Sequence, residues 1–194
     1  LFRFAGQVIA GQGVNFNQAL LDAGVTLAPN SVNPAFASGS NPVLNNAGTI
    51  LTLSSNNLVE RLSINPSGAA GTSGILSNGI STGTGTIRDL SVTATSGSNA
   101  VNLTSNTGAT FNFNNIALTA ASGSGFSATG GGTVSATQNN SSTVNTVTTT
   151  TGQAIKVTST TIGASGLTFR SVASNGGTTT NGITRSEEHT SELQ

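Results

Sequence analysis

The chain has 194 residues, of which 6% are charged, and its formal net charge is zero. An ordinary soluble domain carries roughly 25% charged residues, and the few scattered basic residues here form no stripe that could bind nucleic acid. The absence of Cys excludes disulfides and thiolate metal sites.

Isolated Val, Ile, Leu and Phe are separated by Asn, Ser, Thr, Gly and Ala along the whole chain, and Phe is the only aromatic residue. This composition is typical either of a disordered low-complexity segment or of an extended β architecture. Composition alone leaves both open, so the spacing of the apolar residues has to decide between them.

Residues 1–40 are the least regular part of the chain. Val25–Leu27, and Val43 with Leu44 just beyond, predict short strands. Asn17–Gly24 has helix-like spacing, with Asn17 placed as an N-cap and Gly24 as the residue after the helix end. A helix of one or two turns and further strand are both compatible with this segment. Because the chain begins at Leu1 and contains no Met, we expect the true start and any signal peptide to lie upstream.

Residues 41–184 repeat one signature: a small or amide residue, then Ala or Gly, then a β-branched or aromatic residue. The copies follow one another at intervals of 21, 25, 29 and 28 residues, which predicts coils of roughly 26 residues. They are Asn78-Gly79-Ile80, Asn99-Ala100-Val101, Ser124-Gly125-Phe126, Gln153-Ala154-Ile155 and Asn181-Gly182-Ile183.

An apolar-x-apolar pair forms a second column, and the alternation within each pair predicts strands with one face inward. The pairs are Leu62/Ile64, Leu90/Val92, Ile116/Leu118 and Leu167/Phe169, with Val144 and Val147 expected to fill the irregular stretch 133–150. One unit cannot fold alone, since a buried Val, Ile or Leu contributes only about 1.5–3 kcal/mol. Stacked units would align these residues into buried columns and pair each strand in parallel with its copies.

The irregular intervals argue against a left-handed β-helix of strict hexapeptides, and Gly130–Gly132 lacks the Asp of calcium-binding nonapeptide rolls. Coils of this length with variable turns resemble the right-handed, pectin-lyase-like parallel β-helix. Asn56–Ile64 is similar to the strand-turn phrase of that family, and Thr161–Phe169 resembles phrases of bacterial β-strand-repeat surface proteins. The resemblance covers about residues 40–184 and implies an all-β fold, a right-handed parallel β-helix.

Two charged dipeptides lie in neighbouring units of the repeat. Aligning the apolar pairs of these units shifts the chain by 28 residues and places Glu60 over Arg88 and Arg61 over Asp89. Strands stacked about 4.8 Å apart would bring each charge beside its opposite. We therefore expect two ion pairs that favour this register over slipped ones. A coincidence between two surface dipeptides is the alternative.

The last ten residues, Arg185–Gln194, differ sharply in composition, with half of all acidic residues and the only histidine, His189. At every codon they resemble the in-frame translation of a common short-read sequencing adapter. We therefore expect residues 185–194 to be an artefactual tail of metagenomic data outside the fold, and the natural protein to continue beyond residue 184. A charged helical cap or a linker is the alternative.

The pectin-lyase-like resemblance makes polysaccharide lyases and hydrolases a function class to consider. Their chemistry needs clustered carboxylates, or an acidic calcium site with a basic proton acceptor. Outside the tail the carboxylates are Asp22, Glu60 and Asp89, and the last two adjoin arginines. With no His, Cys or Tyr there, the usual acids, bases and nucleophiles are missing. We expect no enzyme activity, no cofactor, and no catalytic or metal-binding residue.

A run of threonines, Thr148–Thr151, is similar to the threonine arrays of ice-binding solenoids. Such an array must recur at the same site in every coil, and from the sequence this run does not recur. It therefore adds no functional expectation.

The primary hypothesis is a structural or adhesive module, a stalk or passenger segment of a secreted or outer-membrane-anchored bacterial protein. Its expected partners are carbohydrate, a host or neighbouring cell surface, and further coils of its own chain. No apolar run approaches the ~18 residues of a membrane helix, so no membrane insertion is expected. The alternative is a non-catalytic part of a pectin-lyase-like polysaccharide lyase or hydrolase whose catalytic coils lie elsewhere.

Overall fold

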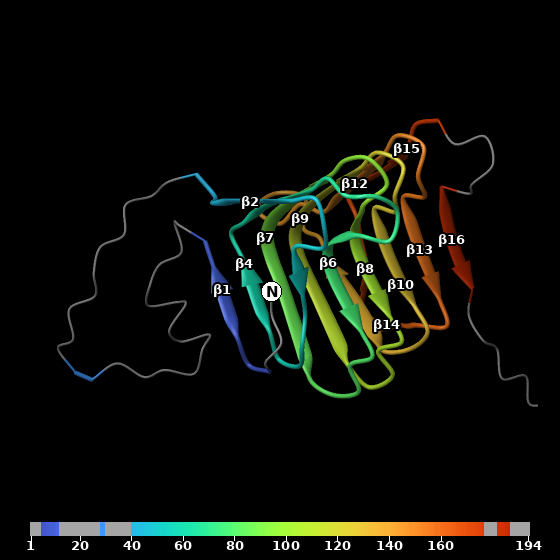
Figure 1. Ribbon diagram of the computed structural model, residues 1–194. Coiled ribbons are helices and arrows are strands. Elements are labelled where there is room, and N and C mark those ends of the chain that lie inside the picture. Colours follow the sequence, from blue (N-terminus) through green and yellow to red (C-terminus); the bar gives the residue numbers. More distant parts are fainter. Residues whose placement is uncertain (1–4, 12–27, 30–39, 177–181, 187–194) are drawn as a thin grey trace, which may run out of the picture.

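The computed structural model shows parallel strands stacked coil upon coil into a β-solenoid (Figure 1). The structure describes residues 5–11, 28–29, 40–176 and 182–186. In these ranges every strand pair is parallel and no residue is helical, so no helix there could span a bilayer. The all-β parallel solenoid predicted from the repeat is confirmed.

Each coil contributes three strand segments, which stack into three ladders. Two of these ladders are parts of a single ten-stranded sheet that bends at a corner, and the third is a six-stranded sheet; the three ladders are called the first, second and third sheets below. The first sheet holds β1 (Val8–Ala10), β4 (Leu58–Glu60), the starts of β7 (Thr84–Ala94) and β9 (Thr110–Ala120), β11 (Thr133–Thr137) and β14 (Thr161–Leu167). The second holds β2 (Val43–Asn46), β5 (Ser63–Pro66), the ends of β7 and β9, β12 (Thr146–Thr149) and β15 (Ser171–Ser174). The third holds β3 (Leu51–Thr52), β6 (Ser73–Asn78), β8 (Asn99–Thr104), β10 (Phe126–Thr129), β13 (Ile155–Thr158) and β16 (Ile183–Ser186).

The core consists of three columns of apolar side chains, one from each sheet, with one residue per coil. The first column is Ile9, Val59, Ile87, Phe113, Ala136 and Leu167. The second is Leu44, Ile64, Val92, Leu118, Val147 and Val172. The third is Leu51, Ile75, Val101, Phe126, Ile155 and Ile183.

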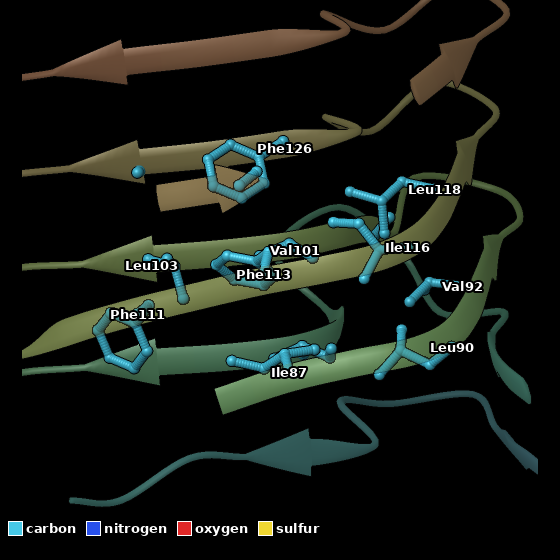
Figure 2. Packing of buried hydrophobic residues seen from close by; sticks show 14 of the residues in the cluster. Ile87, Leu90, Val92, Val101, Leu103, Phe111, Phe113, Ile116, Leu118 and Phe126 are labelled. Atoms are coloured by element: carbon cyan, nitrogen blue, oxygen red, sulfur yellow. The ribbon is translucent and has the colours of Figure 1, made fainter. Parts of the chain in front are cut away.

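The columns meet in the interior of the solenoid, where members from the middle coils are at most 2% exposed. Figure 2 shows Ile87, Phe113, Val101 and Phe126 pointing inward from facing strands. Phe113 and Phe126 meet edge to face across the interior, with ring centroids 5.2 Å apart. Burial of these side chains, repeated at each level, is the source of stability that a single coil lacks.

The third column corrects one predicted member. Val101, Phe126 and Ile155 are buried as expected, but Ile80 is only half-buried and its place is taken by Ile75. Ser73-Gly74-Ile75 has the same signature as Asn78-Gly79-Ile80, and the pattern alone does not say which of the two isoleucines is buried in the column. Gly79 is instead a corner residue with φ of 73°, which ends β6 and turns the chain out of the sheet.

The second column also needs a correction near the C-terminal end of the stack. Leu62, Ile64, Leu90, Val92, Ile116, Leu118 and Val147 are buried as predicted. Leu167 and Phe169 are half-buried, and Leu167 pairs with Ala136 in the first column, while Val172 pairs with Val147 in the second. Ile183 pairs with Ile155 but is 58% exposed, because no described coil packs beyond it.

Asn145, and not Val144, occupies the level of the Leu90 and Ile116 side chains in the coil of β11 and β12. It precedes Thr146, which pairs with Ala117, and it is fully buried. Its Oδ1 accepts a hydrogen bond from the Ile116 N–H at 3.1 Å, and its Nδ2 donates to the carbonyls of Thr137 and Thr168. The amide is therefore satisfied, which removes most of the cost of burying it.

The corner after the third sheet is a column of left-handed residues. Gly79, Ser105, Gly130 and Ser159 have φ of 73°, 54°, 75° and 49°. Each N–H donates to a carbonyl of the next coil, from Gly79 to Thr104 at 3.0 Å through to Ser159 to Ser186 at 3.2 Å. The coil-to-coil hydrogen bonding therefore continues around the corner, which helps to offset the strain of a left-handed Ser.

Several sequence predictions fall at the two ends of the chain. Val43 and Leu44 form β2 as expected, whereas Asn17–Gly24 and Val25–Leu27 lie outside the described residues. β16 ends at Ser186 and so includes the first two residues of the segment 185–194, which the sequence separates from the fold. The side chains of these two residues, Arg185 and Ser186, are exposed. Residues 187–194 lie outside the described residues, so their exclusion from the fold stays a prediction.

A tightly packed position beside the second column predicts a stability effect. A Cβ on Gly125 would lie 2.8 Å from the Ala154 carbonyl oxygen and closer still to Cγ1 of Val147. Gly125→Ala is therefore expected to lower the free energy of unfolding by about 1–3 kcal/mol through overpacking. Gly48→Ala is the control, since its nearest neighbour would be an Asn46 side-chain atom at 3.5 Å. Equal urea unfolding curves for the two variants would contradict this packing.

Candidate functional site

The charged residues of the described ranges do not converge on one site. No group of three or more His, Cys, Asp or Glu that could hold a metal ion lies among the described residues. Asp22 and His189 are outside these ranges. The described carboxylates, Glu60 and Asp89, belong to neighbouring coils, and each already has a hydrogen-bonding partner.

Glu60 and Arg88 form the ion pair expected from the sequence. The two residues are register partners in β4 and β7, and Arg88 Nε donates to Glu60 Oε2 at 2.7 Å. The Glu60 side chain is 2% exposed and that of Arg88 28%, while the second carboxylate oxygen, Oε1, has no hydrogen-bond partner. A buried carboxylate with one partner depends strongly on that partner, because a lone buried charge is costly.

The second expected pair, Arg61 with Asp89, stays a prediction. Arg61, Asp89 and Asn115 all have left-handed φ, between 52° and 53°, and they form the corner between the first and second sheets. Asp89 Oδ1 accepts a hydrogen bond from Asn115 Nδ2 at 2.7 Å, and Asn115 Oδ1 accepts one from the Val144 N–H. Asp89 thus belongs to a ladder of side-chain hydrogen bonds that ties successive coils together at this corner.

The outer side of the second sheet is a continuous face of small uncharged side chains, here named the neutral face. One column of it is Ser63, Ser91, Ala117, Thr146 and Ser171, and the other is Thr93, Thr119, Thr148 and Ala173. All nine are exposed or half-buried, and none is charged. The outer sides of the other two sheets differ, since each carries a half-buried cation, Arg88 on the first sheet and Lys156 on the third.

Threonines recur at one site in three successive coils, but the next coil has Ala173 there, so the array does not extend to every coil. Thr148 is the register partner of Thr119, which is the partner of Thr93. The signal in the sequence is a buried Val or Leu followed at once by Thr, and not the run itself. Thr93 and Thr119 are exposed and Thr148 is half-buried, so all three side chains lie on the outer side of the second sheet.

Hollows lie at the two ends of the stack. The one at the C-terminal end has a volume of about 340 Å³ and is lined by Leu167, Val172 and Ile183 among other apolar residues. The one at the N-terminal end, of about 550 Å³, is lined by Ile9, Leu44 and Leu51 together with polar residues. Both sets are the terminal members of the three core columns, so these hollows mark the ends of the described core, and their described lining residues include no convergent acid–base groups.

Comparison of the chain with protein-family models, with curated protein sequences and with solved structures gives no match.

The Glu60–Arg88 pair predicts a charge-specific stability effect. Arg88→Glu places two carboxylates side by side and is expected to lower the free energy of unfolding by about 3–5 kcal/mol, as for other broken buried pairs. Arg170→Glu, at an exposed position, is the matched control and should change it by no more than about 0.5 kcal/mol.

Two further measurements on this pair separate charge from packing. High salt should shrink the difference between the two variants, and Glu60→Gln in the Arg88→Glu background should restore part of the loss. Equal destabilisation by Arg88→Glu and Arg170→Glu in urea titrations would show that the pair does not stabilise this register.

Proposed function

We propose that this chain is a non-catalytic structural and adhesive β-solenoid segment, a stalk or passenger of a secreted or cell-surface bacterial protein. The neutral face is the observation that carries the proposal. It extends the same two columns of Ser, Thr and Ala side chains over successive coils without a charge. A flat neutral polymer or surface can approach such a face closely, because the side chains of its two columns are short.

The adhesive role rests on the chemistry of the outward threonine hydroxyls. Thr93, Thr119 and Thr148 repeat at the strand spacing of about 4.8 Å, and each hydroxyl both donates and accepts hydrogen bonds. Individual contacts to such groups are weak, of the order of 0.5–1.5 kcal/mol. A repeated array makes many of them at once on a ligand that is itself repetitive, such as a neutral polysaccharide of a cell surface.

The alternative function is a non-catalytic part of a pectin-lyase-like polysaccharide lyase or hydrolase. The positions of Glu60 and Asp89 support the absence of catalysis from this chain, since one carboxylate is paired with Arg88 and the other accepts a hydrogen bond from Asn115. Within the part of the chain that the structure describes, neither lies opposite a second carboxylate, as general acid and base catalysis of glycoside cleavage requires. The test is to incubate the chain with polygalacturonate, with and without Ca²⁺, and to measure cleavage of the polymer. Turnover under either condition would contradict the non-catalytic assignment.

The adhesive role predicts a face-specific loss of binding. The folded chain is incubated with insoluble cellulose, as a flat neutral polysaccharide, and the bound fraction is measured. The triple variant Thr93→Lys, Thr119→Lys, Thr148→Lys is expected to bind at least about tenfold more weakly, which corresponds to 1.4 kcal/mol, because three long charged side chains hold the polymer away from the face.

The matched control carries the same three substitutions on the third sheet, at Thr104, Thr129 and Thr158, which also form one register column. It adds the same charge with the same coil spacing and should bind like the unsubstituted chain. Failure of the unsubstituted chain to bind cellulose, or equal losses in the two triple variants, would count against the neutral face as a polysaccharide-binding surface.

A further inference from the structure

The corner after β6 carries a side chain that the equivalent corners of the following coils lack. Asn78 ends β6, and it is followed by Gly79, whose φ of 73° begins the corner. Both residues are exposed. The register partners of Asn78 in the successive coils are Thr104, Thr129 and Thr158. Of these four described positions, only Asn78 places an amide side chain directly before the corner.

An asparagine followed by a glycine can react with its own backbone. The Gly79 nitrogen, after losing its proton, would attack Cγ of Asn78, and the bond from Cγ to the side-chain nitrogen would break with release of ammonia. Water then opens the resulting succinimide ring at one of its two carbonyl–nitrogen bonds, which leaves aspartate or isoaspartate. Glycine favours the attack because it has no Cβ, and no other heavy atom lies within 4 Å of the place where a Cβ on Gly79 would be.

The closed corner opposes this reaction. The Gly79 N–H donates to the Thr104 carbonyl oxygen at 3.0 Å. The Asn78 side chain stands roughly perpendicular to the sheet, so its Cγ does not face the Gly79 nitrogen. The ring can close only after the hydrogen bond breaks and the peptide between the two residues rotates. The rate is therefore that of an unfolded chain multiplied by the fraction of molecules in which the corner is open.

Isoaspartate would change the corner permanently. Its main chain runs through the side-chain carbonyl and contains one more atom than that of asparagine. The extra atom displaces the Gly79 N–H from the Thr104 carbonyl oxygen. β6 and β8 lie side by side in the third sheet (Figure 1), and coils of a solenoid are stabilised by their neighbours. The contact between these two coils is thus weakened at the modified corner.

We propose that Asn78–Gly79 is a site of spontaneous deamidation, gated by opening of the corner after β6, and that conversion to isoaspartate prevents this corner from closing again. The solenoid then ages at one defined position, between the coil of β6 and the coil of β8. The inference depends on the fold and is independent of the adhesive role of the neutral face.

The first test compares deamidation rates in the folded and the unfolded chain. The full 194-residue chain is incubated at mildly alkaline pH in water labelled with heavy oxygen, with and without denaturing urea. Mass spectrometry of the tryptic peptides 62–88 and 171–185 then reports on Asn78 and on Asn175, which also precedes a glycine but lies outside the strands. Asn78 is expected to deamidate in both samples, roughly tenfold or more slowly in the folded chain.

Asn175 is the internal reference for this comparison, and its rate should differ less between the two samples. An Asn78 that stays unmodified in the folded chain over many half-lives of the unfolded chain would overturn the proposal. A difference at Asn78 no larger than that at Asn175 would also overturn it, because the corner would then provide no gate.

Two substitutions in the same register column separate the dipeptide from its surroundings. Asn78→Thr gives this coil the residue of the following coils and should abolish the modification without changing the urea unfolding curve. Thr129→Asn places an asparagine before Gly130, which has φ of 75° and donates to the Thr158 carbonyl at 3.0 Å. This variant should gain a second gated site, and its failure to deamidate there would count against the role of the corner.

The effect of the additional backbone atom has its own readout. The isoaspartate form is isolated chromatographically from aged protein and compared in urea with the variant Asn78→Asp, which has the same charge and an unaltered main chain. The isoaspartate form is expected to unfold at a lower urea concentration, with faster hydrogen exchange in β6 and β8. Equal unfolding and equal exchange of the two forms would show that the corner closes again after modification.

Discussion

The register between coils is the constraint on which the rest of this molecule depends. Parallel backbone ladders fix which residue of one coil lies over which residue of the next, and side chains alternate sides along each strand. A slip of one residue would turn Ile64, Val92 and Leu118 outward and bring their Ser and Thr neighbours into the core. The filled interior and the uncharged exterior of the second sheet are thus two results of a single alignment.

Corners support this alignment with contacts that do not depend on apolar burial. The left-handed column from Gly79 to Ser159 passes backbone hydrogen bonds between coils at one corner. At the corner between the first and second sheets, Asp89 and Asn115 join neighbouring coils through a side-chain hydrogen bond. The Glu60–Arg88 pair acts at the strand next to that corner. Because these contacts are directional, they specify one register between neighbouring coils, whereas apolar packing alone would tolerate several similar registers.

Much of the architecture could be predicted because the repeat obliges one residue type to recur at one site. Val101, Phe126 and Ile155 were recognisable from three-residue signatures, and the Glu60–Arg88 pair from one shift of the alignment. Local ambiguity explains what could not be predicted. Ile75 and Ile80 follow equivalent signatures five residues apart, and only the course of the chain at Gly79 decides between them.

The same limit applies to the candidate site. Thr93, Thr119 and Thr148 are separated by unequal numbers of residues, so their common column becomes visible only when the coils are stacked. Asn145 could not be expected in an apolar column, because its burial is compensated by partners in three different segments. Sequence patterns report periodic features well, and they miss single polar residues whose partners are brought together by the fold.

Asn145 also bears on how such a solenoid can vary. The chain between β11 and β12 leaves the ladder after Thr137 and returns to it at Thr146, and the exposed residues 139–142 project from this corner. The amide of Asn145 closes the gap that this excursion leaves in the core, so the size of the projecting loop is decoupled from the packing beneath it. This corner is consequently a natural graft site, where segments of different length or sequence can be displayed from the rod without disturbing the coils on either side.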